Sequence, residues 1–250
     1  MTHYKLSKFT CISITAILFS GFLSVSFSQT VDDIIDKYIA AIGGLDKINS
    51  IQTVKITAKT TRRDVDVPLI EYIKKPDKVR TEITMQGQTM IRAYDGSIGW
   101  AISPFRGNKD AEKMNSEETN GMKIMAQFEG PLVNYKDKGS TVELLGKEDY
   151  EGTGVYKIKL TTKDGDIRTF YIDENTYLLL KEDGKRTIME KEINIERVYG
   201  DYRSEDGYIM AHSIESRAGG ERGGSQKVLV EKVEFNIPID DSIFSMPEGK

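Results

Sequence analysis

The sequence predicts a mainly β protein with short helices, in which about eleven antiparallel strands form an incomplete barrel capped by the helices. Most of the chain after residue 52 alternates apolar and polar residues with a period of two. Turn signals such as Gln86-Gly87 and Asp95-Gly96 separate the alternating runs. Only two segments have the 3.6-residue period of an amphipathic helix.

The first 28 residues have the layout of a secretory signal peptide. Lys5 and Lys8 precede the apolar run CISITAILFSGFL, and small residues lead up to Gln29. The run is shorter than the roughly 20 residues that a membrane span needs. Its cysteine, Cys11, is the only one in the chain and does not follow the pattern of a lipoprotein cleavage site. We therefore expect export to the periplasm, cleavage of residues 1–28, and no lipid anchor.

Residues 29–250 are long enough for a single domain with its own core. Loss of the two signal-peptide lysines changes the formal net charge from −4 to −6. Because nucleic-acid binding needs clustered basic charge, the composition argues against it. We expect a monomer that needs no cofactor.

Elements are expected in the following order. Thr30 with Asp33 resembles a capping box and starts a helix with an apolar face of isoleucines and Tyr38, which Gly43-Gly44 ends. Alternation then marks strands such as 54–59, 78–85, 156–160 and 192–196. Further turns are expected at Lys163-Asp164-Gly165, Glu182-Asp183-Gly184 and Glu205-Asp206-Gly207.

One second helix interrupts the strands, in SEETNGMKIMAQFEGPL. Ser116 is the expected N-cap and Gly130-Pro131 the stop, although Gly121 weakens the helix by about 1 kcal/mol. The rest of 106–117 is expected to be a charged loop, and 218–226 a hairpin loop.

A sheet of this length twists and curls, because its apolar face has to leave water. Two short helices cannot cover so wide a face tightly. A curved sheet with an apolar cavity under the helices satisfies the pattern. A fully packed core without a cavity satisfies it equally well.

Several short motifs resemble those of the outer-membrane lipoprotein carrier family, the LolA-like proteins. They are Lys75-Pro76 after a strand, Asp95-Gly96, Trp100, Pro104-Phe105, the hairpin DGDIRTFYIDENTYLLLKE, and the final IDDSIFSMPEG. The resemblance spans nearly all of 29–250. It implies an eleven-stranded half-barrel with a helical lid that binds the acyl chains of lipoproteins.

In that family an arginine before the proline holds the lid through hydrogen bonds to helix carbonyls. Here Lys75 stands in its place. Lysine can donate such bonds but lacks the planar guanidinium fork, so the resemblance implies a weaker latch or none.

The expected cavity lining is apolar and aromatic. Methionines suit variable chains because their side chains adapt in shape, although for each single methionine ordinary core filling is the favoured interpretation. Trp100 could likewise be a core anchor. The candidate lining residues are Ile56, Ile83, Met85, Tyr94, Trp100, Phe105, Met125 and Phe128.

Catalysis is not expected. His3 leaves with the signal peptide, so His212 is the one histidine that could act as a base. The adjacent Ser213 would point to the opposite face of the same strand. Poverty in histidine and cysteine also argues against a metal site. Asp173, Asn175 and Glu182 are better explained as charges on surface hairpins than as calcium ligands.

The sequence therefore leads to a carrier that binds acylated lipoproteins or lipids and delivers them toward the outer membrane. Its expected partners are an inner-membrane extractor and an outer-membrane acceptor. The alternative is an envelope sensor or scaffold of the same fold that binds lipid or a partner protein. We favour the carrier, because a sensor usually brings a second domain or an anchor.

Overall fold

The structure, a computed structural model, describes Met1 and residues 29–62, 65–106, 108–188, 191–219 and 224–248. The expected signal peptide, apart from Met1, and Cys11 with it, lie outside the described residues. No helix in the described ranges is long and apolar enough to cross a membrane.

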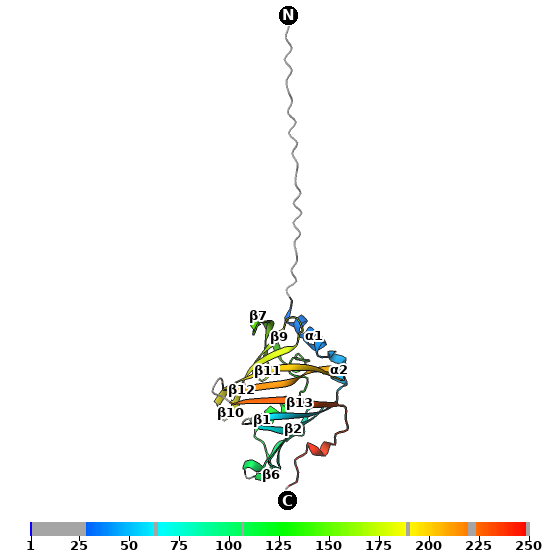
Figure 1. The fold of residues 1–250 in the computed structure, drawn as a ribbon, viewed down its shortest axis with the longest axis vertical. Coiled ribbons are helices and arrows are strands. Elements are labelled where there is room, and N and C mark those ends of the chain that lie inside the picture. The colour runs from blue at the N-terminus through cyan, green and yellow to red at the C-terminus, as the bar shows by residue number, and fades with distance from the viewer. Residues whose placement is uncertain (2–28, 63–64, 107, 189–190, 220–223, 249–250) are drawn as a thin grey trace.

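A single antiparallel sheet of 13 strands makes up most of the described chain (Figure 1). Its order is β6-β5-β4-β3-β2-β1-β13-β12-β11-β10-β9-β8-β7, so the first and last strands pair in the middle while β6 and β7 form the two edges. The strands are β1 (Thr53–Arg62), β2 (Val65–Lys74), β3 (Lys78–Met85), β4 (Gln88–Tyr94), β5 (Gly99–Ser103), β6 (Asn108–Lys113), β7 (Thr141–Tyr150), β8 (Thr153–Thr161), β9 (Ile167–Asp173), β10 (Leu179–Ile188), β11 (Lys191–Glu205), β12 (Tyr208–Ala218) and β13 (Ser225–Phe235).

The expected mainly β incomplete barrel is confirmed, with two strands more than the roughly eleven expected. The expected loop at 106–117 was wrong, since β6 occupies part of it as an edge strand. The expected turn at Glu182-Asp183-Gly184 was also wrong, because these residues lie inside β10. The expected hairpin loop at 218–226 falls partly outside the described residues.

The first helix, α1 (Val31–Ala41), begins as expected. The Thr30 hydroxyl accepts a hydrogen bond from the Asp33 backbone N–H at 3.1 Å, and the Asp33 carboxylate accepts one from the Thr30 N–H at 2.9 Å. This capping box satisfies two backbone donors that the helix cannot satisfy itself. Ile34, Ile35 and Ile39 are buried on one face, so α1 packs as an amphipathic helix.

Two further helices follow. Gly43 turns the chain at a φ of 121°, and its α-carbon lies so close to the backbone of Gly207 that a side chain could not be accommodated. The next helix is α2 (Gly44–Ser50). The helix α3 (Ser116–Met125) is N-capped by Asn115, one residue before the expected Ser116, with Glu118 completing a capping box.

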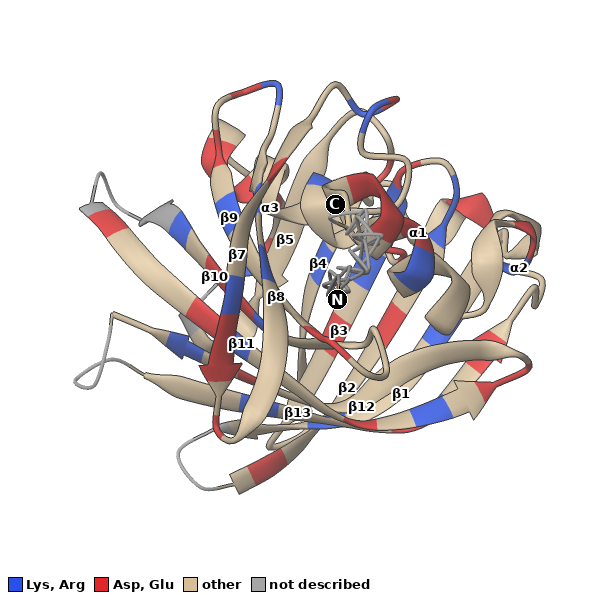
Figure 2. Ribbon diagram, turned by 90° about the horizontal axis from the view of Figure 1, so that it is seen from above, with Lys and Arg blue, Asp and Glu red and all other residues tan. Residues whose placement is uncertain are grey.

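The sheet curves around the helices, so that α1 and α3 lie within the curve (Figure 2). Most of the core gathers at what we call the closed end, where β2 and β13 end. There α1, α2 and the segment 126–135 pack against β8, β9 and β10. The core residues on these strands include Ile172 and Ile158 and continue through Phe170 to Leu160 beside the 162–166 turn, each almost fully buried. The opposite end carries the turns Gln86-Gly87 and 162–166, and we call it the open end.

The C-terminal segment covers part of the outer face. The Trp100 indole donates a hydrogen bond to the Phe244 carbonyl at 2.7 Å, and Arg80 donates one to the Ile243 carbonyl at 2.6 Å. Phe244 is completely buried. The outer surface of β3 and β5 is therefore covered by the chain itself.

Candidate functional site

A large open hollow lies at the open end, with a volume of about 1330 Å³. Side chains of α3 form one side of it, and β9, β10 and β11 form the facing wall. The residues around it are Arg92, Glu117, Asn120, Gly121, Ile124, Met125, Gly165, Asp166, Ile167, Arg168, Thr169, Lys181, Glu182, Asp183, Gly184, Lys185, Glu192, Asn194, Ile195, Glu196, Arg197, Arg217 and Ser225. Four of them, Lys181, Asp183, Glu196 and Arg217, belong to the outer face of the sheet. Charged side chains thus line this hollow together with the apolar Ile124, Met125, Ile167 and Ile195.

Glu182 lies at the centre of a charged group on β9, β10 and β11, and we call Arg168, Glu182 and Arg197 the charged wall. Register places it opposite Phe170 on β9 and Arg197 on β11. Arg168 and Arg197 each approach its carboxylate to 3.3 Å, and the Tyr199 hydroxyl donates a hydrogen bond to it at 2.8 Å. Burial, followed by the Glu182 charge, raises the pKa of Tyr199. The Glu182 side chain is only 7 % exposed, so its charge has to be paired to persist there.

An apolar surface lies on the same inner face of the sheet, on the strands β13, β1, β2 and β3. Ala58, Leu69 and Val230 form a buried cluster, and Ile56, Ile83, Val228 and Val233 pack against it while remaining partly exposed. We call these seven residues the apolar wall. Cross-strand register joins β13, β1, β2 and β3 here, because Val233 faces Ile56 and Leu69 faces both Ala58 and Ile83.

The helix α3 separates the core from the hollow. Met122 is fully buried in the core, whereas Ile124 and Met125 line the hollow, and Met125 is 38 % exposed. Flexible methionine and branched isoleucine thus face the open space from the helix.

Lys75 connects the sheet to α2. Its Nζ donates a hydrogen bond to the Ile48 carbonyl at 2.8 Å and lies 5.2 Å from the centre of the Phe128 ring. Burial lowers the pKa of Lys75. Lys75 therefore donates a hydrogen bond to a helix carbonyl, a contact that the sequence had left open at this position.

The candidate lining residues divide into three groups. Ile56 and Ile83 belong to the apolar wall, and by strand alternation Met85 lies on the same inner face. Met125 lines the hollow itself. Tyr94 and Phe128 belong to the closed end, where Phe128 packs edge-on against Tyr208.

Two candidates lie elsewhere. Trp100 is buried on the outer face beneath the C-terminal segment, opposite Ala93 and 5.8 Å from the Arg80 guanidinium. Its expected place in the cavity was wrong. Phe105 is 41 % exposed in the short 3-10 turn Pro104–Arg106.

Two carboxylates were missed, although one left a signal. Glu71 stands between Leu69 and Ile73 in the alternating run VPLIEYIKK and therefore shares their inward face. The signal in the sequence is the charge of Glu71 at a position of the strand where the alternation calls for an apolar residue. Glu182 gave no such signal, because Glu-Asp-Gly is a common turn sequence.

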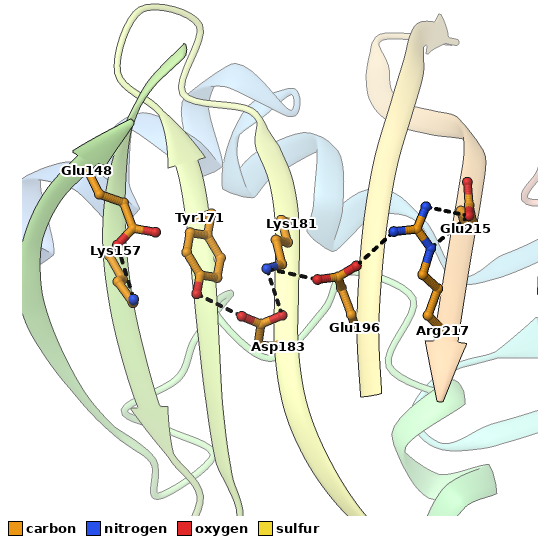
Figure 3. Close-up of polar contacts among 8 residues, drawn as sticks. All are labelled: Glu148, Lys157, Tyr171, Lys181, Asp183, Glu196, Glu215 and Arg217. Atoms are coloured by element: carbon orange, nitrogen blue, oxygen red, sulfur yellow. Dashed lines mark hydrogen bonds and ion pairs between the residues drawn. The ribbon is translucent and has the colours of Figure 1, made fainter. Parts of the chain in front are cut away.

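The outer face of β8–β12 also carries charges, but they are arranged differently (Figure 3). The Asp183 carboxylate accepts a hydrogen bond from the Tyr171 hydroxyl at 2.7 Å. Lys181 forms ion pairs with Asp183 at 3.2 Å and with Glu196 at 2.9 Å. Farther along the row, Arg217 forms an ion pair with Glu215 at 2.9 Å. In Figure 3 these side chains project from the side of the sheet opposite α1. We interpret this row as cross-strand pairing that stabilises the sheet. The described residues contain no cluster of three or more potential metal-ligating His, Cys, Asp or Glu side chains.

Comparisons with known proteins support the fold. A family model described only as an uncharacterized protein matches residues 125–248. No curated protein matches the sequence significantly.

Three solved structures share the architecture. A LolA superfamily protein from Nitrosomonas europaea has 14 % identity and a TM-score of 0.60, covering 87 % of this chain and 98 % of its own. A DUF1329 family protein from Desulfovibrio piger has 14 % identity and a TM-score of 0.59, with the same coverage of 87 % and 98 %. A domain assigned to outer membrane lipoprotein sorting, from Vibrio parahaemolyticus, has 15 % identity and a TM-score of 0.55, covering 85 % and 94 %. The fold of this chain is therefore LolA-like.

Proposed function

We propose that this protein is a soluble periplasmic carrier that holds an acyl chain of a lipoprotein or lipid in the hollow and delivers it toward the outer membrane. Two observations support the proposal: the open hollow between α3 and the charged wall, and the apolar wall on the same inner face of the sheet. The solved structure assigned to lipoprotein sorting shares the fold. The partners are an inner-membrane extractor and an outer-membrane acceptor, and the carrier acts as a monomer after removal of residues 1–28.

The energetics suit a carrier. Burial of a methylene contributes about 0.8 kcal/mol, so a sixteen-carbon chain supplies on the order of 12 kcal/mol before any cost is subtracted. Binding that strong makes release slow. A carrier therefore needs a competing contact that opens when cargo enters and closes when cargo leaves. The Lys75 bond to Ile48 is such a contact, because it ties α2 to the sheet.

Two contacts position the cargo. Apolar side chains on β1, β2, β3 and β13 receive the aliphatic part, and Ile124 with Met125 covers it from α3. The charged wall at Glu182 borders the hollow and faces the polar part. The ligand expected from this division is an amphiphile.

Native mass spectrometry tests the proposal. The protein is purified from the periplasm and measured before and after incubation with an acylated lipoprotein in detergent micelles. We expect a bound species of defined mass that Ile83→Asp abolishes. The matched control is Leu229→Asp, because Leu229 is 37 % exposed on neighbouring β13. A protein that takes up neither lipoprotein nor lipid would contradict the carrier function.

A further inference from the structure

Glu71 is a carboxylate set into the apolar part of the inner face. It lies on β2 between Leu69 and Ile73, both of which are buried. Its cross-strand neighbours are Ile56 on β1 and Thr81 on β3, at a spacing of about 5 Å between β-carbons. The side chain thus borders the apolar wall directly.

The Glu71 carboxylate has no partner of its own. Among the described residues no hydrogen bond or ion pair reaches it, in contrast to Glu182 with its two arginines and a tyrosine. The residue nevertheless keeps part of its surface accessible. An acceptor that is enclosed by apolar side chains and still reachable is a position for a ligand atom.

Among the described residues, no charged group on the surrounding elements forms an ion pair with the Glu71 carboxylate. The register runs from Glu71 through Thr81 to Arg92 on β4, which is two strands away. From α3, Glu117 borders the hollow. Burial alone raises the pKa of Glu71 to about 7, so the carboxyl changes its charge near neutral pH.

We propose that the cargo is an aliphatic amphiphile whose head carries an N–H or O–H donor, and that Glu71 accepts the hydrogen bond from it. This inference rests on the carrier function proposed above and names the chemistry of its ligand. A chain on the apolar wall brings its polar end to Glu71 when the first few carbons cover Ile56 and Ile83.

Displacement of the hydrophobic dye N-phenyl-1-naphthylamine tests this with two ligands of matched length. Dodecylamine carries a donor, whereas dodecyl methyl ether does not. At pH 8 the wild-type protein should bind the amine about tenfold more tightly than the ether, since a hydrogen bond to a charged group is among the stronger ones. In Glu71→Gln the preference should fall below about threefold. The control Glu231→Gln removes an exposed carboxylate on β13 and should keep the wild-type preference.

The pH dependence gives a second signature. Between pH 5.5 and 8.5 the Glu71 carboxyl loses its proton while dodecylamine stays charged. Affinity for the ether should therefore fall as pH rises, and affinity for the amine should increase. Both trends should disappear in Glu71→Gln.

The outcomes separate the two proposals. If the dye and both ligands bind, but wild type and Glu71→Gln show the same preference at every pH, the role of Glu71 is wrong and the carrier function stands. If neither the dye nor a ligand enters the wild-type protein, both proposals fail.

Discussion

The two ends of the barrel use one sheet in opposite ways. At the closed end, α1, α2 and the segment 126–135 bury the inner face almost completely. At the open end the same face borders a hollow of about 1330 Å³, and two carboxylates, Glu71 and Glu182, take inward positions between the two ends. The closed end thus provides stability and leaves the open end available for a ligand. Several substitutions test this difference between the two ends.

The largest effect is expected at Glu182. Glu182→Ala removes the partner of Arg168 and Arg197 and leaves their charges without compensation, which should cost about 3–5 kcal/mol of unfolding free energy. Urea denaturation measures the loss. The control is Glu196→Ala in the outer row, where pairs with Lys181 and Arg217 are more exposed and the cost should stay below about 1 kcal/mol. Equal losses would show that the charged wall is an ordinary surface network.

Core truncation compares the ends directly. Ile158→Ala at the closed end removes a fully buried side chain and should cost about 3 kcal/mol. The same change at Ile83, which is only partly buried in the apolar wall, should cost about 1 kcal/mol. Urea midpoints of the ligand-free protein test the difference. A cost at Ile83 as large as that at Ile158 would indicate a closed, packed core at both ends.

Glu71 should make stability depend on pH. Its pKa is raised from 4.5 to about 7, so the folded state favours the protonated form. The stability of wild type relative to Glu71→Gln should be fully present below about pH 4.5 and lost as pH rises to about 7. Above that pH the glutamine variant should be more stable by up to about 3 kcal/mol. Urea midpoints between pH 4 and 8 measure this, with Glu231→Gln expected to show no such trend.

The smallest effect concerns the contact between Lys75 and α2. Lys75→Met removes the hydrogen bond to Ile48 and should destabilise α2 locally by about 1 kcal/mol. Amide hydrogen exchange in residues 44–51 should then become about fivefold faster, with exchange in β8 unchanged. Lys74→Met is the control, because Lys74 binds the C-terminal segment at Ile239 and Asp241. Unchanged exchange in α2 would mean that Lys75 does not hold it.

Local features of the fold could be predicted from the sequence. The Thr30 and Asp33 capping box and the Gln86-Gly87 turn depend on neighbouring residues alone, and both are found. β6 was not expected because an exposed edge strand with the sequence NKDAEK has no apolar alternation. The turn expected at Glu182-Asp183-Gly184 failed because Glu182 is paired by arginines from two neighbouring strands.

The candidate site was predictable only in part. Alternation identified Ile56 and Ile83 as inward, but it cannot tell which face of β5 the C-terminal segment covers. Trp100 was therefore assigned to the wrong face. Register across several strands, which brings Glu71 and the apolar wall together, is a tertiary property.

In the proposed carrier, an acyl chain lies against the apolar wall on the inner face of the sheet and extends to the hollow. Cys11 is the only cysteine and precedes residue 29, so the chain 29–250 accepts a single introduced thiol. Ile83→Cys and, as control, Leu229→Cys are labelled with an environment-sensitive fluorophore and titrated with an acylated lipoprotein. We expect a blue-shifted, saturable emission from position 83 and no change at position 229. Equal responses at both positions, or none at 83, would contradict this placement of the acyl chain.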